Sequence, residues 1–245
     1  MRAFLDQKFW NLLPLISAPM PFQLALDEVL LELVEELALP LFRFYFASEK
    51  SITVGYSEGT VPKKGDRLRM PVYRRITGGG RVEHGRDLLF MLLAKKENEG
   101  SFRSVRLSYL KIHEAVKLGM EKLGLQPRFY RCDERLTRGP ECFLHPIATD
   151  LAWKGRKIAG GAQKRTRGYF LHQESIQLQE VSADLMIPKI KEGFETVFEM
   201  KWRLEDLEPL WLERATVLAL EKYETSMERQ ILKTEEAYER VRIFS

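Results

Sequence analysis

The sequence predicts an α+β fold, in which a mixed and mainly antiparallel sheet is flanked by helices. Three observations favour this class. Helical periodicity occurs near both ends of the chain and in one central stretch. Short β-type runs separated by tight turns fill the rest, as in hairpins. No internal repeat, heptad pattern or low-complexity segment indicates a different architecture.

The totals predict a single domain of ordinary composition. The 245 residues fit one domain over 1–245, with a helical C-terminal part from about residue 183. A net charge of +4 is too small to predict nucleic-acid binding, although basic residues gather between Lys154 and Arg167 and leave a local acidic or phosphate-bearing partner open. No run is long enough for a membrane span. Two cysteines without a CxxC pair indicate a cytoplasmic protein without a disulfide framework.

The N-terminal part predicts one helix and two strands. An apolar start over residues 9–22 contains three prolines and lacks a signal-peptide pattern. Leucines at helical spacing then predict an amphipathic helix over residues 22–38, which Pro40 ends. Residues 41–46 are aromatic or apolar on both faces and predict a central strand. A second strand is expected at residues 51–56, before a charged loop.

The middle of the chain predicts a buried strand followed by a helix. The strand is expected at residues 87–94, which are almost wholly apolar. The helix begins at Val105 and ends near Gly124, because large side chains recur there at helical spacing. His113 lies beside the apolar stripe of this helix, and we interpret it as a helix-surface histidine.

The last part predicts short strands and then helices. A Lys154-Gly155 turn joins two strands into a hairpin. The tail from about residue 183 is expected to be helical, and residues 225–240 predict a charged surface helix. The strands of this part are expected at residues 127–131, 149–153, 157–162, 169–172 and 175–178.

The glycine segment, residues 74–84, is the strongest candidate for a binding site. It reads Arg-Arg-Ile-Thr-Gly-Gly-Gly-Arg-Val-Glu-His. Glycine lacks a Cβ, so this backbone can take positive φ and let a ligand approach closely. The arginines suit a carboxylate or a phosphate. On these residues alone, a glycine hairpin with solvated arginines is the alternative. The segment matches neither a phosphate loop nor a dinucleotide-binding pattern.

Two further residues are candidates for chemistry. Lys157 lies beside small residues at a hairpin turn, where its ammonium group could reach a carbonyl or phosphate; a solvated turn lysine is the alternative. Cys142 lies on a predicted loop and is either a nucleophile stabilised by nearby cations or a small buried hydrophobe. Cys132 is weaker, because Asp133 would disfavour its thiolate. Histidines and cysteines show no metal-ligand spacing, so no metal is expected, and a Ser-His-Asp triad stays open.

Three segments together resemble the lipoate–protein ligase and octanoyltransferase family, within the biotin/lipoate ligase superfamily. The glycine segment is similar to the family's R-R-x-S/T-G-G-G-x-V-x-H. Asp150-Leu151 followed by residues 155–163 is similar to its D-L, a short spacer, then G-R/K-K-I/F-A/S-G-x-A. Residues 171–176 resemble its L-H-Q/H-G-S/T-I/L, except that Glu174 stands where the family usually has glycine.

The resemblance implies a catalytic domain of the biotin/lipoate ligase type, which has a class II synthetase-like sheet. It also implies a pocket for an octanoyl or lipoyl group, in which Lys157 holds the acyl carbonyl. The acceptor would be a lysine of a lipoyl domain of 2-oxoacid dehydrogenase or glycine cleavage proteins. The residues expected to line the acyl pocket are Arg74, Arg75, Thr77, Gly78, Gly79, Gly80, His84, Asp150, Gly160, Gly161, Ala162 and His172.

Two subclasses compete within this resemblance. Octanoyltransferases take the acyl group from acyl carrier protein without a cofactor, and Cys142-Phe143 resembles the pair that carries a thioester in one branch. Ligases use ATP and Mg²⁺ and commonly carry an accessory domain, which the predicted C-terminal helices do not resemble. We therefore predict an octanoyltransferase with Cys142 and Lys157 as catalytic residues. A ligase lacking the accessory domain is the first alternative, a non-catalytic binding relative the second, and a biotin ligase a further one.

Overall fold

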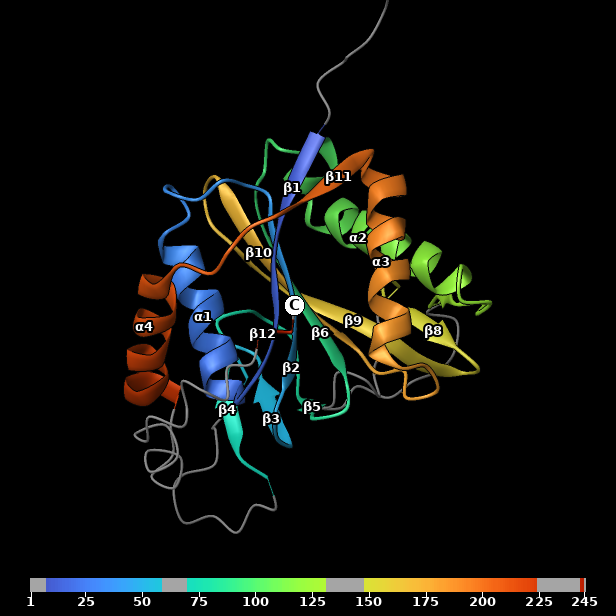
Figure 1. The fold of residues 1–245 in the computed structure, drawn as a ribbon. Helices are drawn as coiled ribbons and strands as arrows, with labels where there is room; N and C mark the ends of the chain where they lie inside the picture. The colour runs from blue at the N-terminus through green and yellow to red at the C-terminus, as the bar shows by residue number, and fades with distance from the viewer. Residues whose placement is uncertain (1–7, 59–69, 131–147, 224–242, 245) are drawn as a thin grey trace, which may run out of the picture.

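A large mixed sheet lies between two pairs of helices in the computed structural model (Figure 1). The structure describes residues 8–58, 70–130, 148–223 and 243–244. The helices are α1 (Met20–Glu32), α2 (Val105–Glu121), α3 (Ala183–Phe198) and α4 (Pro209–Leu218), with a 3-10 turn at Gly100–Arg103 and a π-helical turn at Ala219–Tyr223. In this part of the chain, none of the helices has the length and apolar character needed to cross a membrane.

The large sheet combines parallel and antiparallel pairs. Its strands are β1 (Lys8–Ala18), β2 (Leu41–Ala47), β6 (Leu88–Lys95), β7 (Arg128–Phe129), β8 (Leu151–Trp153), β9 (Arg156–Arg165), β10 (Tyr169–Ile176), β11 (Met200–Leu204) and β12 (Ile243–Phe244). They follow the order β11-β1-β2-β6-β10-β9-β8-β7, with β12 beside β1. Strand β1 is parallel to β2 and β11, and the other pairs are antiparallel. The predicted α+β class is therefore confirmed.

A second, small sheet carries the glycine segment. Its strands are β3 (Ser51–Val54), β4 (Val72–Arg74) and β5 (Val82–His84). Strand β3 lies in the middle, parallel to β4 and antiparallel to β5. The glycine segment thus leads from one outer strand to the other past the end of β3. The alternative of a glycine hairpin is wrong, because β4 and β5 are not neighbours in this sheet.

Each face of the large sheet has its own core. Helices α2 and α3 cover an aromatic face, where the rings of Phe42 and Phe90 lie 4.9 Å apart, centre to centre. Helices α1 and α4 cover a mainly aliphatic face, where Leu13 of β1 and Leu26 of α1 belong to the same core. Strand β2 lies between β1 and β6 and contributes side chains to both cores, as predicted for a central strand. Burial of one such large side chain stabilises the fold by about 1.5 to 3 kcal/mol.

Three sequence predictions need correction. Strand β1 occupies what was interpreted only as an apolar start, and Pro14 falls where its register with β2 shifts, a position where a missing N–H is tolerated. Strand β11 interrupts the tail that was expected to be helical. The first helix ends at Glu32 rather than residue 38, and turns follow it. The predicted surface helix over 225–240 lies outside the described residues.

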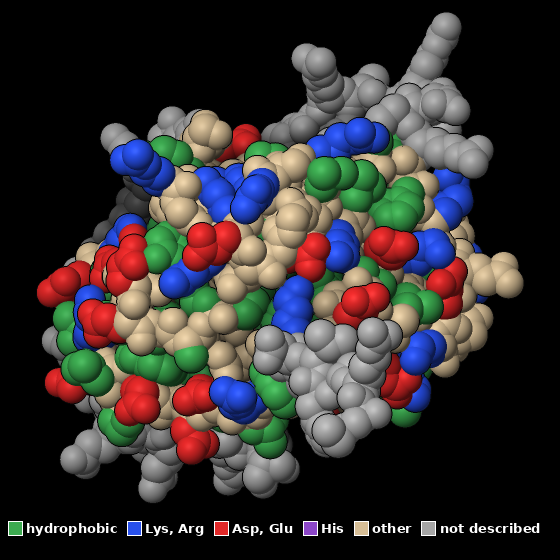
Figure 2. Space-filling view, turned by 90° about the horizontal axis from the view of Figure 1, so that it is seen from above, with side chains coloured by type: hydrophobic (Ala, Val, Ile, Leu, Met, Phe, Trp, Pro, Cys, Tyr) green, Lys and Arg blue, Asp and Glu red, His purple; other side chains and the backbone are tan. Residues whose placement is uncertain are grey.

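The surface in the view from above carries charges of both signs. Lys and Arg side chains alternate there with Asp and Glu, and small hydrophobic groups lie between them (Figure 2). Ion pairs of this kind join Lys122 to Glu192 and Lys201 to Glu195. Exposed pairs like these contribute little to stability, because water and salt screen them.

Candidate functional site

A pocket lies where the small sheet meets α1 and the middle of the large sheet. About 460 Å³ of space lies between its walls, a volume that includes solvent at its open side. Apolar side chains form much of its wall, and polar side chains of β3, β5 and β10 complete it. Its lining residues are Met20, Leu24, Tyr45, Thr53, Arg75, Val82, His84, Leu89, Gly160, Gly161, Ala162, Gln173, Glu174 and Ser175. A pocket of this kind suits an apolar chain with a polar head.

Lys157 and Asp150 form an ion pair on the pocket side of β9. Lys157 Nζ lies 2.8 Å from Asp150 Oδ2, and each side chain is only 3% exposed. A Cβ on Gly160 would lie 2.3 Å from Lys157 Nζ, so the lysine occupies the space that this glycine leaves free. Gly160 pairs with Ser175 of β10, and directly opposed residues point to the same face. Ser175 in turn pairs with Leu89, which belongs to the core under α1 and lines the pocket, so the lysine ammonium group lies on the pocket face.

Arg75 braces the glycine segment from within. Its Nη1 donates to Thr53 Oγ1 at 3.0 Å, and its Nη2 donates to the carbonyl oxygens of Gly78 and Gly80 at 2.7 and 2.8 Å. The side chain is buried, with 5% of the residue exposed. These contacts fix the curvature of the segment beside the pocket. The expected role of this arginine in holding an acyl head stays a prediction.

Arg74 ties the segment to the chain that follows β3. Its Nη1 donates to the carbonyl oxygens of Gly55, Tyr56 and Glu58 at 3.0, 2.9 and 2.6 Å. Gly55 has to be a glycine here, because a Cβ would lie 1.9 Å from the carbonyl oxygen of Gly79. The two glycine-containing stretches therefore touch backbone to backbone, which gives the loop a fixed position.

A buried polar network connects the segment to α1. Thr77 Oγ1 donates to Gln173 Oε1 at 2.7 Å, and Gln173 Nε2 donates to Asp27 Oδ2 at 2.6 Å. Asp27 in turn accepts from Arg43 Nε and Nη2 at 2.8 and 2.6 Å. This network was not predicted from the sequence. An arginine inside an otherwise apolar strand was its one signal, since a buried charge requires a partner.

His84 stands between a hydroxyl group and a carboxylate. Its Nε2 lies 2.8 Å from Thr53 Oγ1 and its Nδ1 lies 2.8 Å from Asp87 Oδ2, while Ser175 Oγ donates to the same carboxylate oxygen at 2.6 Å. Burial alone would raise the pKa of Asp87, but the charge of His84 and these hydrogen bonds outweigh it and lower that pKa. The carboxylate thus orients His84, which lines the pocket. His84 was predicted as a site residue from the sequence, whereas Asp87 was not.

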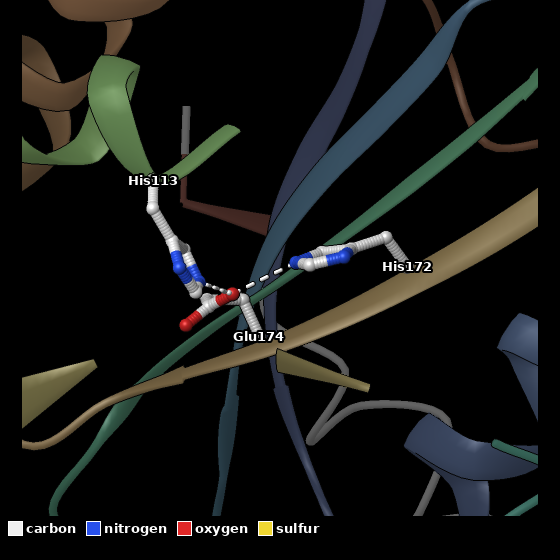
Figure 3. Close-up of side chains that lie close together, drawn as sticks. All are labelled: His113, His172 and Glu174. Carbon is white, nitrogen blue, oxygen red and sulfur yellow. Dashed lines mark hydrogen bonds and ion pairs between the residues drawn. The ribbon is translucent and has the colours of Figure 1, made fainter. Parts of the chain in front are cut away.

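A second buried cluster lies on the α2 side of the sheet (Figure 3). Glu174 Oε2 lies 2.9 Å from His113 Nε2 and 2.7 Å from His172 Nε2, and all three side chains are fully buried. A Cβ on Gly161 would lie 2.5 Å from this carboxylate oxygen. The interpretation of His113 as a surface histidine is wrong, because α2 turns it onto the sheet and Glu174 supplies its partner. The glutamate at position 174, where the resembling family usually has glycine, was the one signal in the sequence for this cluster.

The protonation of the cluster follows from its contacts. Burial alone would lower the pKa of His113, but the charge of Glu174 outweighs it and raises that pKa. Burial lowers the pKa of His172, which favours a neutral ring. The pKa of Glu174 falls to about 2, because the charge of His113 and two hydrogen bonds outweigh burial. These shifts favour a protonated His113, an ionised Glu174 and a neutral His172.

These three side chains also have the geometry to share a metal ion, with one ligand atom each within 4.8 Å of the others. The surrounding contacts favour protons instead. Arg165 Nη1 donates to Gln163 Oε1 at 2.7 Å, which turns Gln163 Nε2 toward His172 Nδ1 at 3.1 Å. His172 Nδ1 then accepts, so its Nε2 carries the proton that points at Glu174.

The fold gathers most of the predicted site residues at the pocket. Arg75, His84 and residues 160–162 line it. Thr77, Lys157, Asp150 and His172 each contact a lining residue, whereas Arg74 braces the loop behind it. Cys142, the predicted nucleophile, lies outside the described residues.

Comparison with known proteins gives a consistent result. The family model of the lipoyl protein ligase A/B catalytic domain matches residues 19–186. The chain is also 30% identical over 206 residues to the protein named Octanoyltransferase LipM from Geobacillus kaustophilus (strain HTA426). That match covers 79% of this chain and 73% of the relative.

Solved structures show the same fold at lower identity. Lipoate-protein ligase A, crystallised with ATP, gives a TM-score of 0.69 at 19% identity, covering 96% of this chain and 100% of that one. A structure described as a bi-partite lipoate protein ligase and its E2 lipoyl domain, from Thermoplasma acidophilum, gives 0.67 at 18% identity, covering 97% and 98%. At these identities the likeness concerns the fold alone.

Proposed function

We propose, since the chain belongs to the lipoyl protein ligase A/B catalytic domain family, that it is an octanoyltransferase of protein lipoylation. The observation that carries this proposal is the 30% identity to Octanoyltransferase LipM over 79% of the chain. The reaction would move an octanoyl group onto the side-chain amine of a lysine in a lipoyl domain. A lipoyl domain as acceptor is supported by the bi-partite ligase that is described together with its E2 lipoyl domain.

The pocket supplies what an octanoyl group needs. Met20, Leu24 and Leu89 offer an apolar wall for the alkyl chain. Polar groups of Thr53 and Gln173 also line the pocket. Burial of a methylene group in such surroundings contributes about 0.8 kcal/mol, so an eight-carbon chain gains appreciably more than a short one. This supports a medium-chain acyl substrate.

Lys157 is proposed to polarise the acyl carbonyl. Its ammonium group lies on the pocket face, held by Asp150 at 2.8 Å. When an amine or thiolate attacks the carbonyl carbon, negative charge develops on the carbonyl oxygen, and a cation placed beside it lowers the barrier. Asp150 would keep the ammonium group oriented. The fixed pair thus acts on the transition state more than on the bound substrate.

Cys142 is proposed to carry the acyl group between donor and acceptor. Its thiolate would attack the thioester of octanoyl-acyl carrier protein, forming the Cys142 thioester and releasing the carrier thiolate. The lysine amine of the lipoyl domain would then attack this thioester, forming an amide and returning the thiol of Cys142 with the proton that the amine loses. Both reaction steps start from a thioester, in which the acyl group is already activated, so the two steps require no ATP. This assignment rests on the resemblance at residues 142–143.

A two-arm transfer assay tests the proposed function. One arm gives the full chain octanoyl-acyl carrier protein and a purified lipoyl domain, without ATP, and follows the mass of the lipoyl domain. The other arm replaces the donor by free lipoate or octanoate with ATP and Mg²⁺. We expect modification in the first arm. Modification in the second arm alone would establish a ligase instead, and binding without modification in either arm would establish the non-catalytic relative.

A further inference from the structure

A line of contacts joins the buried His113 cluster to the lysine on the opposite face of the sheet. His113 Nδ1 donates to the carbonyl oxygen of Thr149, one of the two residues directly before β8, which are called the loop before β8 below. The next residue is Asp150, which holds Lys157 at 2.8 Å. The backbone N–H of Tyr130 donates to the carbonyl oxygen of Asp150 at 2.8 Å. The two residues before β8 are therefore tied at both carbonyl groups, one of them by α2.

Two adjacent glycines of β9 allow this arrangement. Successive residues of a strand face opposite sides of the sheet. The space beside Gly160 is occupied by Lys157 and Asp150, and the space beside Gly161 by His172 and Glu174. The ion pair and the histidine cluster therefore approach the same point of the strand from its two faces, with no side chain of β9 between them.

Glu174 is what keeps His113 in place. Two histidine nitrogens lie within 2.9 Å of its Oε2. A protonated His113 donates through both ring nitrogens, to this carboxylate and to the Thr149 carbonyl oxygen. Without Glu174, the buried ring loses the charge that stabilises its protonated form. The bond to Thr149 would then lose its charge-assisted strength.

We propose that His113 and Glu174 are positioning residues, whose buried contact fixes the Thr149 carbonyl group and thereby Asp150 and the ammonium group of Lys157. The inference rests on the proposed function of Lys157. His113 is not among the residues that line the pocket, and the side chain of Glu174, a residue that borders it, is fully buried in the cluster. Their effect reaches the reaction through the loop before β8, so it concerns the transition state, where the position of the ammonium group matters most.

Three variants separate positioning from general stability. Glu174→Gln keeps the shape and removes the charge. The double variant His113→Leu with Glu174→Leu removes both partners, so that no unpaired charge is buried and folding is preserved. Ile190→Ala, a core substitution in α3 that leaves both His113 and Glu174 in place, is the matched control for lost stability.

Two measurements are made on each variant. The first is the single-turnover rate of octanoyl transfer, together with KM for octanoyl-acyl carrier protein. The second is acetylation of Lys157 by acetic anhydride, quantified by peptide mass spectrometry against the other lysines of the same sample. The second measurement does not depend on activity, so it decides the inference even if the wild-type protein transfers no octanoyl group, an outcome that would overturn the proposed function alone.

The two charge-removing variants should lose about tenfold to a hundredfold in transfer rate with little change in KM, as expected for a misplaced catalytic group. Their Lys157 should become severalfold more reactive toward acetic anhydride, while Ile190→Ala leaves it protected. The inference is overturned if Lys157 stays as protected as in the wild-type protein, or if its labelling changes equally in the Ile190→Ala control.

Discussion

Lys157 is the single side chain on which the proposed chemistry depends most. We predict that Lys157→Ala lowers octanoyl transfer about a hundredfold or more, because it removes the charge that stabilises the developing oxyanion. Lys164→Ala, which changes another lysine of the same strand, is the matched control and should retain most activity. Circular dichroism should show that both variants are folded. Transfer by Lys157→Ala at the level of the control would remove this residue from the reaction.

The ionised Glu174 makes a prediction about stability and pH. Its pKa in the folded protein is about 2, below that of an unfolded glutamate, so its stabilising effect is present above the unfolded pKa and is lost as the pH falls. Urea unfolding of the wild-type protein and of the double variant His113→Leu with Glu174→Leu, in which no buried histidine loses its partner, should show a stability difference that narrows by about 2 kcal/mol between pH 6 and pH 3. A difference that stays constant over this range would show that the carboxylate is not ionised in the folded protein.

The sequence identified the residues of the pocket better than those of the buried networks. Arg75, His84 and Lys157 carry recognisable patterns, and all three lie at or beside the pocket. His113 was misplaced, because helical periodicity does not show which partner a polar side chain will meet across the sheet. The same limit applies to Asp27, which lies off the leucine stripe of its helix yet is fully buried against Arg43. Long-range polar pairs leave no periodic signal.

Among the elements, the glycine segment depends on a close backbone contact with the end of β3. We predict that Gly55→Ala destabilises the protein by about 3 kcal/mol or more, because its Cβ would lie 1.9 Å from the Gly79 carbonyl oxygen. Gly78→Ala is the control, since a Cβ there meets nothing within 4 Å. Thermal unfolding measures both. Equal melting temperatures for the two variants would show that the segment does not pack on β3 as described.

Helices α2 and α3 approach each other through two glycines. A Cβ on Gly193 would lie 2.1 Å from the Ala115 carbonyl oxygen, and one on Gly119 would lie 2.6 Å from Ile190 Cα. We predict that Gly193→Ala costs roughly 1 to 3 kcal/mol of unfolding free energy, because the helices have to separate. Urea unfolding checks this, with Gly168→Ala as the control in open space. A cost no larger than that of the control would contradict the close packing.

Elements whose contacts are local in the sequence were predicted better than elements that pair with distant segments. The hairpin of β8 and β9 was predicted correctly, because Lys154 and Gly155 form its turn and both adopt positive φ. Strands β1 and β11 were missed. These two strands are parallel neighbours although they lie near opposite ends of the sequence, so no tight turn between them indicates that they pair. Turn residues thus predicted hairpins, whereas pairing between strands that are distant in the sequence could not be predicted from local residues.

At the scale of the whole molecule, the predicted family and fold class are confirmed. The family model matches residues 19–186, and ligase structures share the fold. The sequence motifs that predicted the family lie on strands of both sheets, and these strands surround one pocket. The domain boundaries and the roles of the site residues stay predictions, and Cys142 lies outside the described residues. The choice between transferase and ligase therefore depends on chemistry rather than on the fold.

The formation of an acyl-enzyme on Cys142 tests the central claim most directly. The full chain is mixed with octanoyl-acyl carrier protein without ATP or acceptor, and its intact mass and peptides are measured. We predict an octanoyl adduct on Cys142 that disappears when a lipoyl domain is added, and no adduct on Cys142→Ser. The absence of any adduct on the wild-type protein, together with modification of a lipoyl domain by lipoate and ATP, would contradict the account.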